Sequence, residues 1–153
     1  MSLFPLFARK TLLSGEEQAQ VIEAVRAAEQ KTSGEIRVYV ESRCKFVNPL
    51  DRAVQVFEVL RMEATRDRNA VLVYIAVKDR QLAIFADEGI YKKAGAAFWD
   101  EAVNTMLRHF NSSSYGQGIA TVVHEIGNTL EANFPYDAQT DKNELPDDIV
   151  FGR

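Results

Sequence analysis

The sequence predicts a single α/β domain, in which a small mixed β-sheet is sandwiched by about four helices. Three observations support this fold class: residues 35–41 alternate polar and apolar, residues 70–77 are continuously apolar, and apolar residues recur at helical spacing between and around them. With 153 residues, 46% of them apolar and 26% charged, the chain is long enough to bury one hydrophobic core.

Two helices are predicted in the first half of the chain. Ser14 and Glu17 have the spacing of a capping box, which begins a helix that runs to about residue 31. Asn48 is a good N-cap and Pro49 suits the first helical position, so a second helix starts there. The apolar stripe predicted for this second helix consists of Leu50, Ala53, Val54, Phe57 and Leu60.

The two strand signals differ in kind. The alternation over 35–41 is typical of a strand, and the apolar run over 70–77 is typical of a central strand covered on both faces. Because a helix joins them, we expect the two strands to be parallel, with a right-handed crossover. Lys78 and Asp79 then form a two-residue turn, and residues 80–86 return as an antiparallel hairpin strand.

The second half of the chain is predicted to be helical before it becomes polar. A third helix is expected over residues 91–109 and a fourth over 115–132, with the serine run 112–114 as the turn and cap between them. We assign residues 1–136 to the domain and residues 137–153 to a polar, acidic tail that is expected to be mobile. The apolar tail residues able to dock it are Leu145, Ile149, Val150 and Phe151.

Composition excludes several classes of function. A net charge of −4 argues against a nucleic-acid partner, because proteins that bind nucleic acids normally present a basic face. Cys44 is the only cysteine, so no intrachain disulfide forms, and we interpret it as a core residue. No run approaches the roughly 20 apolar residues of a transmembrane segment. We expect a cytoplasmic protein, and an apolar cluster within residues 3–7 either packs on its own core, which we favour, or makes it membrane-peripheral.

Residues 124–128 contain part of the zinc-protease motif, in which two histidines four residues apart bind the metal. Asn128 replaces the second histidine, and the apolar periodicity turns His124 toward solvent. The chain also has no phosphate-binding glycine loop, no GxSxG elbow and no Cys/His pairing. Carboxylates are therefore the remaining candidates for chemistry.

One group of oxygen ligands is predicted at the start of the central strand. If Val77 pairs with Arg80 across the turn, Ala70 faces Asp87, and the neighbouring polar residues meet at one end of the sheet. Such oxygen ligands suit Ca²⁺ or Mg²⁺. The candidate metal ligands are Asp67, Asn69, Asp87 and Glu88. The alternative is that Arg66 and Arg68 neutralise these acids as ordinary surface ion pairs.

A second polar group is predicted at the opposite end of the sheet. Asp79 and Arg80 are expected near Glu41, at the carboxyl end of the parallel pair. Open α/β sheets bind ligands at that end, so these three residues are candidates for binding a ligand other than a metal ion.

With these motifs the chain resembles the TPM-domain family. The family is named for a thylakoid lumen protein, a photosystem II repair protein and a worm modulator of acetylcholine receptors. The resemblance covers residues 12–134 and depends on the order of several short motifs. These are Leu13-Ser14, Ser33-Gly34-Glu35-Ile36, Asn69-Ala70-Val71-Leu72, Asp79-Arg80, Asp87-Glu88-Gly89-Ile90, and Phe110 with Tyr115 and Gly118. Phe98-Trp99 and Asn143-Glu144-Leu145-Pro146-Asp147 look like a cytoplasmic bacterial branch without signal peptide or membrane helix.

The resemblance implies an α/β sandwich and a loosely defined activity. Such domains are often described as acid phosphatases, some look like divalent-cation binders, and bacterial relatives tend to be encoded beside LemA-like membrane proteins. The family usually opens the central strand with Asp-Asn-Gly, whereas here Arg68 takes the acidic position and Ala70 the glycine. A cationic Arg68 lowers the affinity expected for a divalent ion.

Two hypotheses follow for function. The favoured one is a non-catalytic interaction or accessory domain for membrane-protein or envelope processes, with a LemA-like membrane protein as the implied partner. The alternative is a metal-assisted acid phosphatase that uses Asp67, Asp87 and Glu88, with the metal ion as Lewis acid and activator of water. Whether the protein is an enzyme stays open, no catalytic residue is assigned, and Ca²⁺ or Mg²⁺ are the only cofactors considered.

Overall fold

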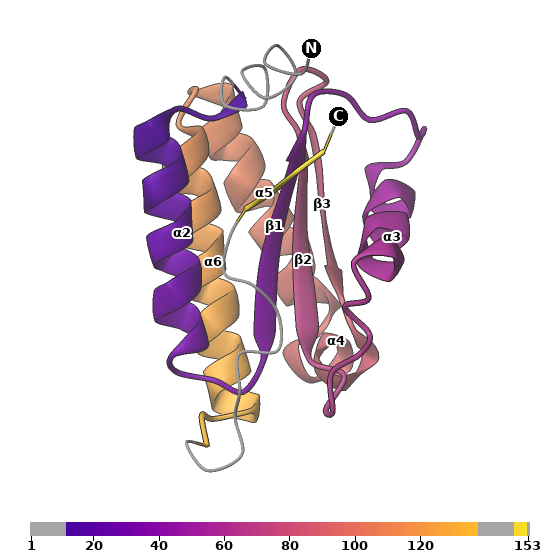
Figure 1. The fold of residues 1–153 in the computed structure, drawn as a ribbon, viewed down its shortest axis with the longest axis vertical. Coiled ribbons are helices and arrows are strands. Elements are labelled where there is room, and N and C mark those ends of the chain that lie inside the picture. The colour runs from indigo at the N-terminus through magenta and orange to yellow at the C-terminus, as the bar shows by residue number, and fades with distance from the viewer. Residues whose placement is uncertain (1–11, 138–148, 153) are drawn as a thin grey trace, which may run out of the picture.

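The structure is a computed structural model that describes residues 12–137 and 149–152. Its elements are α2 (Gly15–Glu29), β1 (Glu35–Glu41), α3 (Pro49–Val59), β2 (Ala70–Ala76), β3 (Gln81–Ala86), α4 (Glu88–Ala94), α5 (Ala96–Asn111), α6 (Tyr115–Asn133) and β4 (Val150–Phe151). The strands form one sheet in the order β3-β2-β1-β4, in which β1 is parallel to β2 and β4, and β3 is antiparallel to β2. Helices α2, α5 and α6 lie on one side of the sheet and α3 on the other (Figure 1). The predicted fold class is confirmed.

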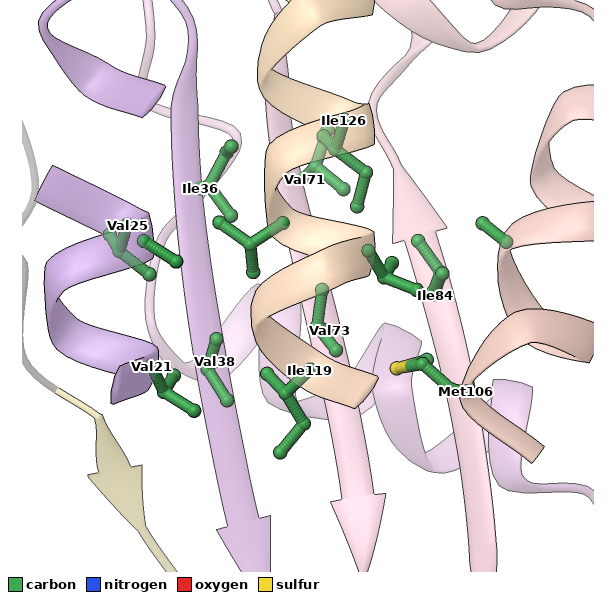
Figure 2. Packing of buried hydrophobic residues seen from close by; sticks show 14 of the residues in the cluster. Val21, Val25, Ile36, Val38, Val71, Val73, Ile84, Met106, Ile119 and Ile126 are labelled. Carbon is green, nitrogen blue, oxygen red and sulfur yellow. The ribbon is translucent and has the colours of Figure 1, made fainter. Parts of the chain in front are cut away.

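The alternation of side chains along each strand produces two separate hydrophobic clusters. On β2, Val71, Val73 and Ile75 pack toward α2, α5 and α6, while Leu72 and Tyr74 pack toward α3. Figure 2 shows the larger cluster, in which valines and isoleucines of the strands meet side chains of α2, α5 and α6. All seven residues of β2 are buried, as predicted for a central strand.

Local sequence signals set the starts of the first two helices. Ser14 Oγ accepts from the Glu17 N–H at 3.1 Å and Glu17 Oε1 accepts from the Ser14 N–H at 2.8 Å, which confirms the capping box. Asn48 Oδ1 accepts from the Leu50 N–H at 2.9 Å and caps α3. The stripe predicted for α3 is wrong at Leu50, which is 42% exposed, because the helix buries Ala53, Val56 and Phe57 instead.

The predicted hairpin register is confirmed. Ala76 pairs with Gln81 and Val71 with Ala86, and the Asp87 N–H donates to the carbonyl oxygen of Ala70 at 2.9 Å. The strands themselves stop at Ala76 and Gln81, so the connection is a four-residue turn and not a two-residue one. Within that turn, Arg80 adopts a left-handed conformation with φ of 52°.

The third predicted helix is two helices. Gly95, with φ of 88°, separates α4 from α5, and residues with side chains rarely adopt that conformation. Beyond α5, Ser114 occupies the N-cap position of α6 as predicted, but its side chain makes no capping hydrogen bond. On α6, His124 and Asn128 are exposed, which confirms that they point away from the core.

A fourth strand, β4, extends the sheet beyond the predicted strands. Val150 pairs with Tyr39, Phe151 pairs with Val40, and Ile149 is buried beside them. Ile149, Val150 and Phe151 therefore dock this part of the predicted tail on the sheet. Leu145 and the apolar cluster within residues 3–7 lie outside the described residues. Among the helices of the described ranges, none is both long and apolar enough to cross a membrane.

Candidate functional site

At the start of β2, Arg68 and Asp87 form a bidentate ion pair. Arg68 Nε lies 2.7 Å from Asp87 Oδ2, and Arg68 Nη2 lies 2.9 Å from Asp87 Oδ1. The Asp87 carboxylate is buried, and its Oδ1 also accepts from the Glu88 N–H at 2.8 Å, which caps α4. The hydrogen bonds to Asp87 raise the pKa of Arg68 above its ordinary value. Both oxygens of this carboxylate are therefore taken up by groups of the protein.

The other predicted metal ligands are held separately. The Asp67 carboxylate lies 3.3 Å from Arg66 Nη2, and the exposed Glu88 carboxylate lies 3.6 Å from Arg68 Nη1. Asn69 is buried and its Nδ2 donates to Ser33 Oγ at 3.5 Å. The structure thus brings Asp87 and Glu88 to one arginine, while Asp67 pairs with a different one.

This donor set fits a divalent cation poorly. A metal ion needs carboxylate oxygens directed at one point, and Arg68 occupies both oxygens of the most buried acid. Within the described ranges, no three acidic, histidine or cysteine side chains form a group able to hold a metal ion. The cation site of Asp67, Asn69, Asp87 and Glu88 stays a prediction, and Arg68 is the group that opposes it.

At the other end of the sheet, Glu41 is the centre of a buried polar network. Its carboxylate accepts from Arg52 Nε and Arg52 Nη2, each at 2.9 Å, and from the Tyr74 hydroxyl. Burial, followed by the hydrogen bond to Glu41, raises the pKa of the Tyr74 phenol far above its ordinary value. The hydrogen bond to Glu41 likewise raises the pKa of Arg52, whose guanidinium also lies 5.7 Å from the centre of the Tyr39 ring.

Asp79 lies at the predicted end of the sheet, where it contacts the residues that follow Glu41. Asp79 Oδ1 accepts from Arg43 Nη1 at 3.0 Å and Asp79 Oδ2 accepts from the Cys44 N–H at 2.7 Å, so this acid fixes the loop that follows β1. Arg80 is exposed in the hairpin turn and does not line the pocket described next. Of the three residues predicted to bind a ligand, Glu41 alone is part of that pocket.

A pocket of about 540 Å³ lies beside Glu41, at the carboxyl ends of β1 and β4. Its lining residues are Tyr39, Glu41, Arg43, Lys45, Phe46, Arg52, Gln55, Phe151 and Gly152. In Figure 1 the loop after β1 runs toward α3 at one end of the sheet, while α4 is at the opposite end. The volume lies within the range of about 300–1,000 Å³ that is usual for small-molecule sites.

Most of the pocket residues were not predicted from the sequence. Arg52 and Gln55 come from α3, and their contact with β1 depends on how that helix is placed across the sheet. One signal was available: the polar positions of the β1 alternation include Tyr39 and Glu41 on one face. A polar strand face beside an apolar helix stripe indicates a part of the sheet that the helix does not cover.

The fold is that of a small α/β domain with a pocket at the carboxyl edge of its sheet. A family model described as the TPM domain matches residues 7–129, which is most of the chain. The chain belongs to the TPM-domain family. It matches none of the curated proteins with which it was compared.

Several solved structures share this fold. The BA42 protein from the psychrophilic bacterium Bizionia argentinensis is 36% identical, with 92% of this chain and 95% of that one covered and a TM-score of 0.83. The N-terminal domain of the cg2496 protein from Corynebacterium glutamicum is 19% identical, with 77% and 74% covered and a TM-score of 0.57. The N-terminal domain of a P. gingivalis protein is 16% identical, with 80% and 79% covered and a TM-score of 0.63. The last two show similarity of fold alone.

Proposed function

We propose that this TPM-domain protein is a non-catalytic binding domain, which serves as an accessory component of a membrane-protein or envelope complex. The observation that supports it is the state of the two buried acids at the ends of the sheet. Asp87 accepts from Nε and Nη2 of Arg68, and Glu41 accepts from Nε and Nη2 of Arg52. A carboxylate whose two oxygens are both held by an arginine has no oxygen directed at a substrate, whereas a general acid or base must contact the group whose proton it transfers.

The pocket beside Glu41 is the contact site in this proposal. It is concave, has the size of a small-molecule site, and is built from β1, the loop that follows it, α3 and the end of β4. Arg52 and Glu41 line it as an ion pair, and their polar groups are satisfied by each other, by Tyr74 and by Gln55. An ion pair of this kind favours the binding of a ligand and not its chemical conversion.

The alternative function is the metal-assisted phosphatase. What favours it is that Asp67 keeps a partly exposed carboxylate beside Arg66 and Glu88 a largely exposed one beside Arg68, and arginine is a side chain suited to contact with phosphate. In this alternative Asp67, Asp87 and Glu88 would hold Ca²⁺ or Mg²⁺, and the ion would supply Lewis acidity to activate water.

The two functions are separated by an activity assay. The purified protein is incubated with p-nitrophenyl phosphate in Ca²⁺, in Mg²⁺ and in chelator, beside the Asp67→Asn and Glu88→Gln variants. The proposal expects no release of nitrophenol above the blank under any condition. Metal-dependent release that both substitutions abolish would establish the phosphatase and overturn the proposal.

The accessory role is tested by recovery of a partner. The full chain is crosslinked in cells and membranes are fractionated, with a LemA-like membrane protein as the partner to be detected. We expect the protein to be cytoplasmic and membrane-peripheral, and to be recovered with that partner. A matched comparison uses Lys45→Glu at the pocket and Lys92→Glu on α4, and only the first should reduce recovery.

A further inference from the structure

The pocket lies where the strand order of the sheet reverses. From β1 the chain runs to β2 and β3 on one side, and it returns on the other side of β1 as β4. Ligands of open α/β sheets bind outside the carboxyl ends of parallel strands at such a point. Glu41, the last residue of β1, and Phe151, the last residue of β4, both line the pocket.

Among the residues that the structure describes, one positive charge at the pocket has no counter-ion. Arg52 is paired with Glu41, and Arg43 is paired with Asp79. Lys45 is exposed at the rim, and in the described part of the chain no hydrogen bond or ion pair holds its ammonium group. This excess occurs in a protein whose net charge is −4, so it is a local feature of the site.

The walls of the pocket are aromatic. Tyr39, Phe46 and Phe151 line it and are each half-buried, so part of each side chain is accessible. The Tyr39 ring is fixed between the Tyr74 ring, with a centroid distance of 6.1 Å, and the Arg52 guanidinium. Aromatic walls of this kind favour a flat apolar body, which packs against them by offset stacking or edge contacts.

The wall formed by β4 is held firmly against β1. The Gly152 N–H donates to the carbonyl oxygen of Val40 at 2.7 Å, and a Cβ at Gly152 would meet Tyr39 Oη at 2.2 Å. Gln55 accepts from Arg52 Nη1 through Oε1, so its amide nitrogen is the end of the side chain that has hydrogens to donate. The pocket therefore offers Lys45, the remaining Arg43 donors and the Gln55 amide.

From these features we infer that the pocket binds a small monocarboxylate that carries an aromatic body. One uncompensated positive charge matches a single carboxylate, whereas a dianionic phosphate monoester would leave negative charge unneutralised. Arg43 and Lys45 bind the carboxylate at the rim, and the ring packs against Phe46 and Phe151. This inference rests on the proposed function, because it names the ligand class of the same binding site.

The experiment is a titration of the ¹⁵N-labelled full chain, followed by amide chemical shifts. The probes are sodium benzoate, benzyl alcohol and phenyl phosphate, which share the ring and differ in charge. Benzoate is expected to give saturable shifts at Lys45, Gln55 and Gly152. Lys45→Gln should weaken benzoate about fivefold, the order expected for one partly exposed charge pair. Lys92→Gln, on α4 at the opposite end of the sheet, should leave benzoate affinity unchanged.

Four results would overturn the inference. They are the absence of saturable shifts at the pocket, equal affinity for benzyl alcohol, tighter binding of phenyl phosphate than of benzoate, and an equal effect of the two lysine substitutions. Release of inorganic phosphate from phenyl phosphate is measured in the same samples. Such release would contradict the proposed non-catalytic function, whereas a lack of benzoate binding without release would contradict the ligand class alone.

Discussion

Arg68 reaches across the start of β2 and holds the Asp87 carboxylate with two nitrogens, at 2.7 and 2.9 Å. Arg68 does so from a left-handed backbone conformation, with φ of 52°, and its carbonyl oxygen accepts from the Gly89 N–H at 2.8 Å. One residue therefore connects the loop before β2 with the first turn of α4 through both its side chain and its backbone. Two of the predicted metal ligands, Asp87 and Glu88, pair with this arginine.

Replacement of Arg68 by Gln is expected to strengthen the binding of divalent cations. The substitution removes a positive charge and both hydrogen bonds that Arg68 donates to Asp87, next to Glu88. Thermal unfolding is followed by circular dichroism over a series of Ca²⁺ concentrations, in wild type and variant. The Arg68→Gln protein should show the larger rise in Tm, since a ligand at 100 times its Kd stabilises by about 2.7 kcal/mol.

The control for this prediction is Arg26→Ala, an exposed position on α2 that also removes one positive charge. It should leave the Ca²⁺ response of the wild type unchanged. If the wild type is already stabilised as strongly as Arg68→Gln, then Arg68 does not oppose the cation.

Replacement of Gly89 by Ala is expected to destabilise the fold strongly. A Cβ at this position would lie 2.1 Å from the carbonyl oxygen of Asp67 and 2.5 Å from that of Arg68. Both contacts are with backbone atoms, so the neighbours cannot rotate away. The free energy of unfolding should therefore fall by about 3 kcal/mol or more. Unfolding in urea measures the change.

Gly15 in α2 provides the matched control for Gly89, because both glycines lie at the start of a helix. A Cβ there would have no neighbour within 4 Å, so Gly15→Ala should be neutral or raise the free energy of unfolding by about 0.4–1 kcal/mol. Equal unfolding free energies for the two variants would show that the close approach at Gly89 does not restrict the residue.

The parts of the fold that the sequence predicts are those with local signals. The capping box at Ser14 and Glu17 positions α2, and the alternation over β1 together with the apolar run of β2 identifies the parallel pair. The hairpin register follows because the two strands are joined by a short turn, which leaves few ways to align them.

The errors have physical reasons of the opposite kind. Gly95 interrupts a continuous apolar periodicity, and its positive φ depends on how α4 and α5 pack. The strand β4 has two residues, and its pairing with β1 is a long-range contact that no local pattern announces. Register placed Asp87 correctly, and the structure pairs it with Arg68, which is the ion-pair alternative that the sequence left open beside the cation site.

The phenol of Tyr74 is expected to make the stability of the protein depend on pH in the alkaline range. Burial and the hydrogen bond to Glu41 raise its pKa above the unfolded value of about 10, so the folded state retains its proton where the unfolded state loses it. The resulting stabilisation is fully present below about pH 10 and is lost as the pH rises further.

The variant Tyr74→Phe separates this effect from general alkaline unfolding. It should cost about 1–3 kcal/mol at neutral pH, because the buried Glu41 carboxylate loses a donor. Above about pH 10 its free energy of unfolding should fall less steeply than that of the wild type, as measured by urea unfolding at several pH values. Tyr136→Phe, at an exposed tyrosine, should retain the wild-type slope.

The ion pair of Arg52 and Glu41 is expected to be strongly non-additive under mutation. Arg52→Met leaves a buried carboxylate with one donor in place of three, at a cost near the lower end of about 3–5 kcal/mol, since 22% of the Arg52 side chain is exposed. The double variant Glu41→Gln with Arg52→Met removes the unpaired charge, so it should be more stable than Arg52→Met alone. Urea unfolding of the wild type, both single variants and the double variant gives the coupling free energy. Additive effects would mean that Arg52 contributes packing against Tyr39 and not charge. Arg52 and Glu41 would then not neutralise each other, and Lys45 would not be the single excess positive charge at the pocket.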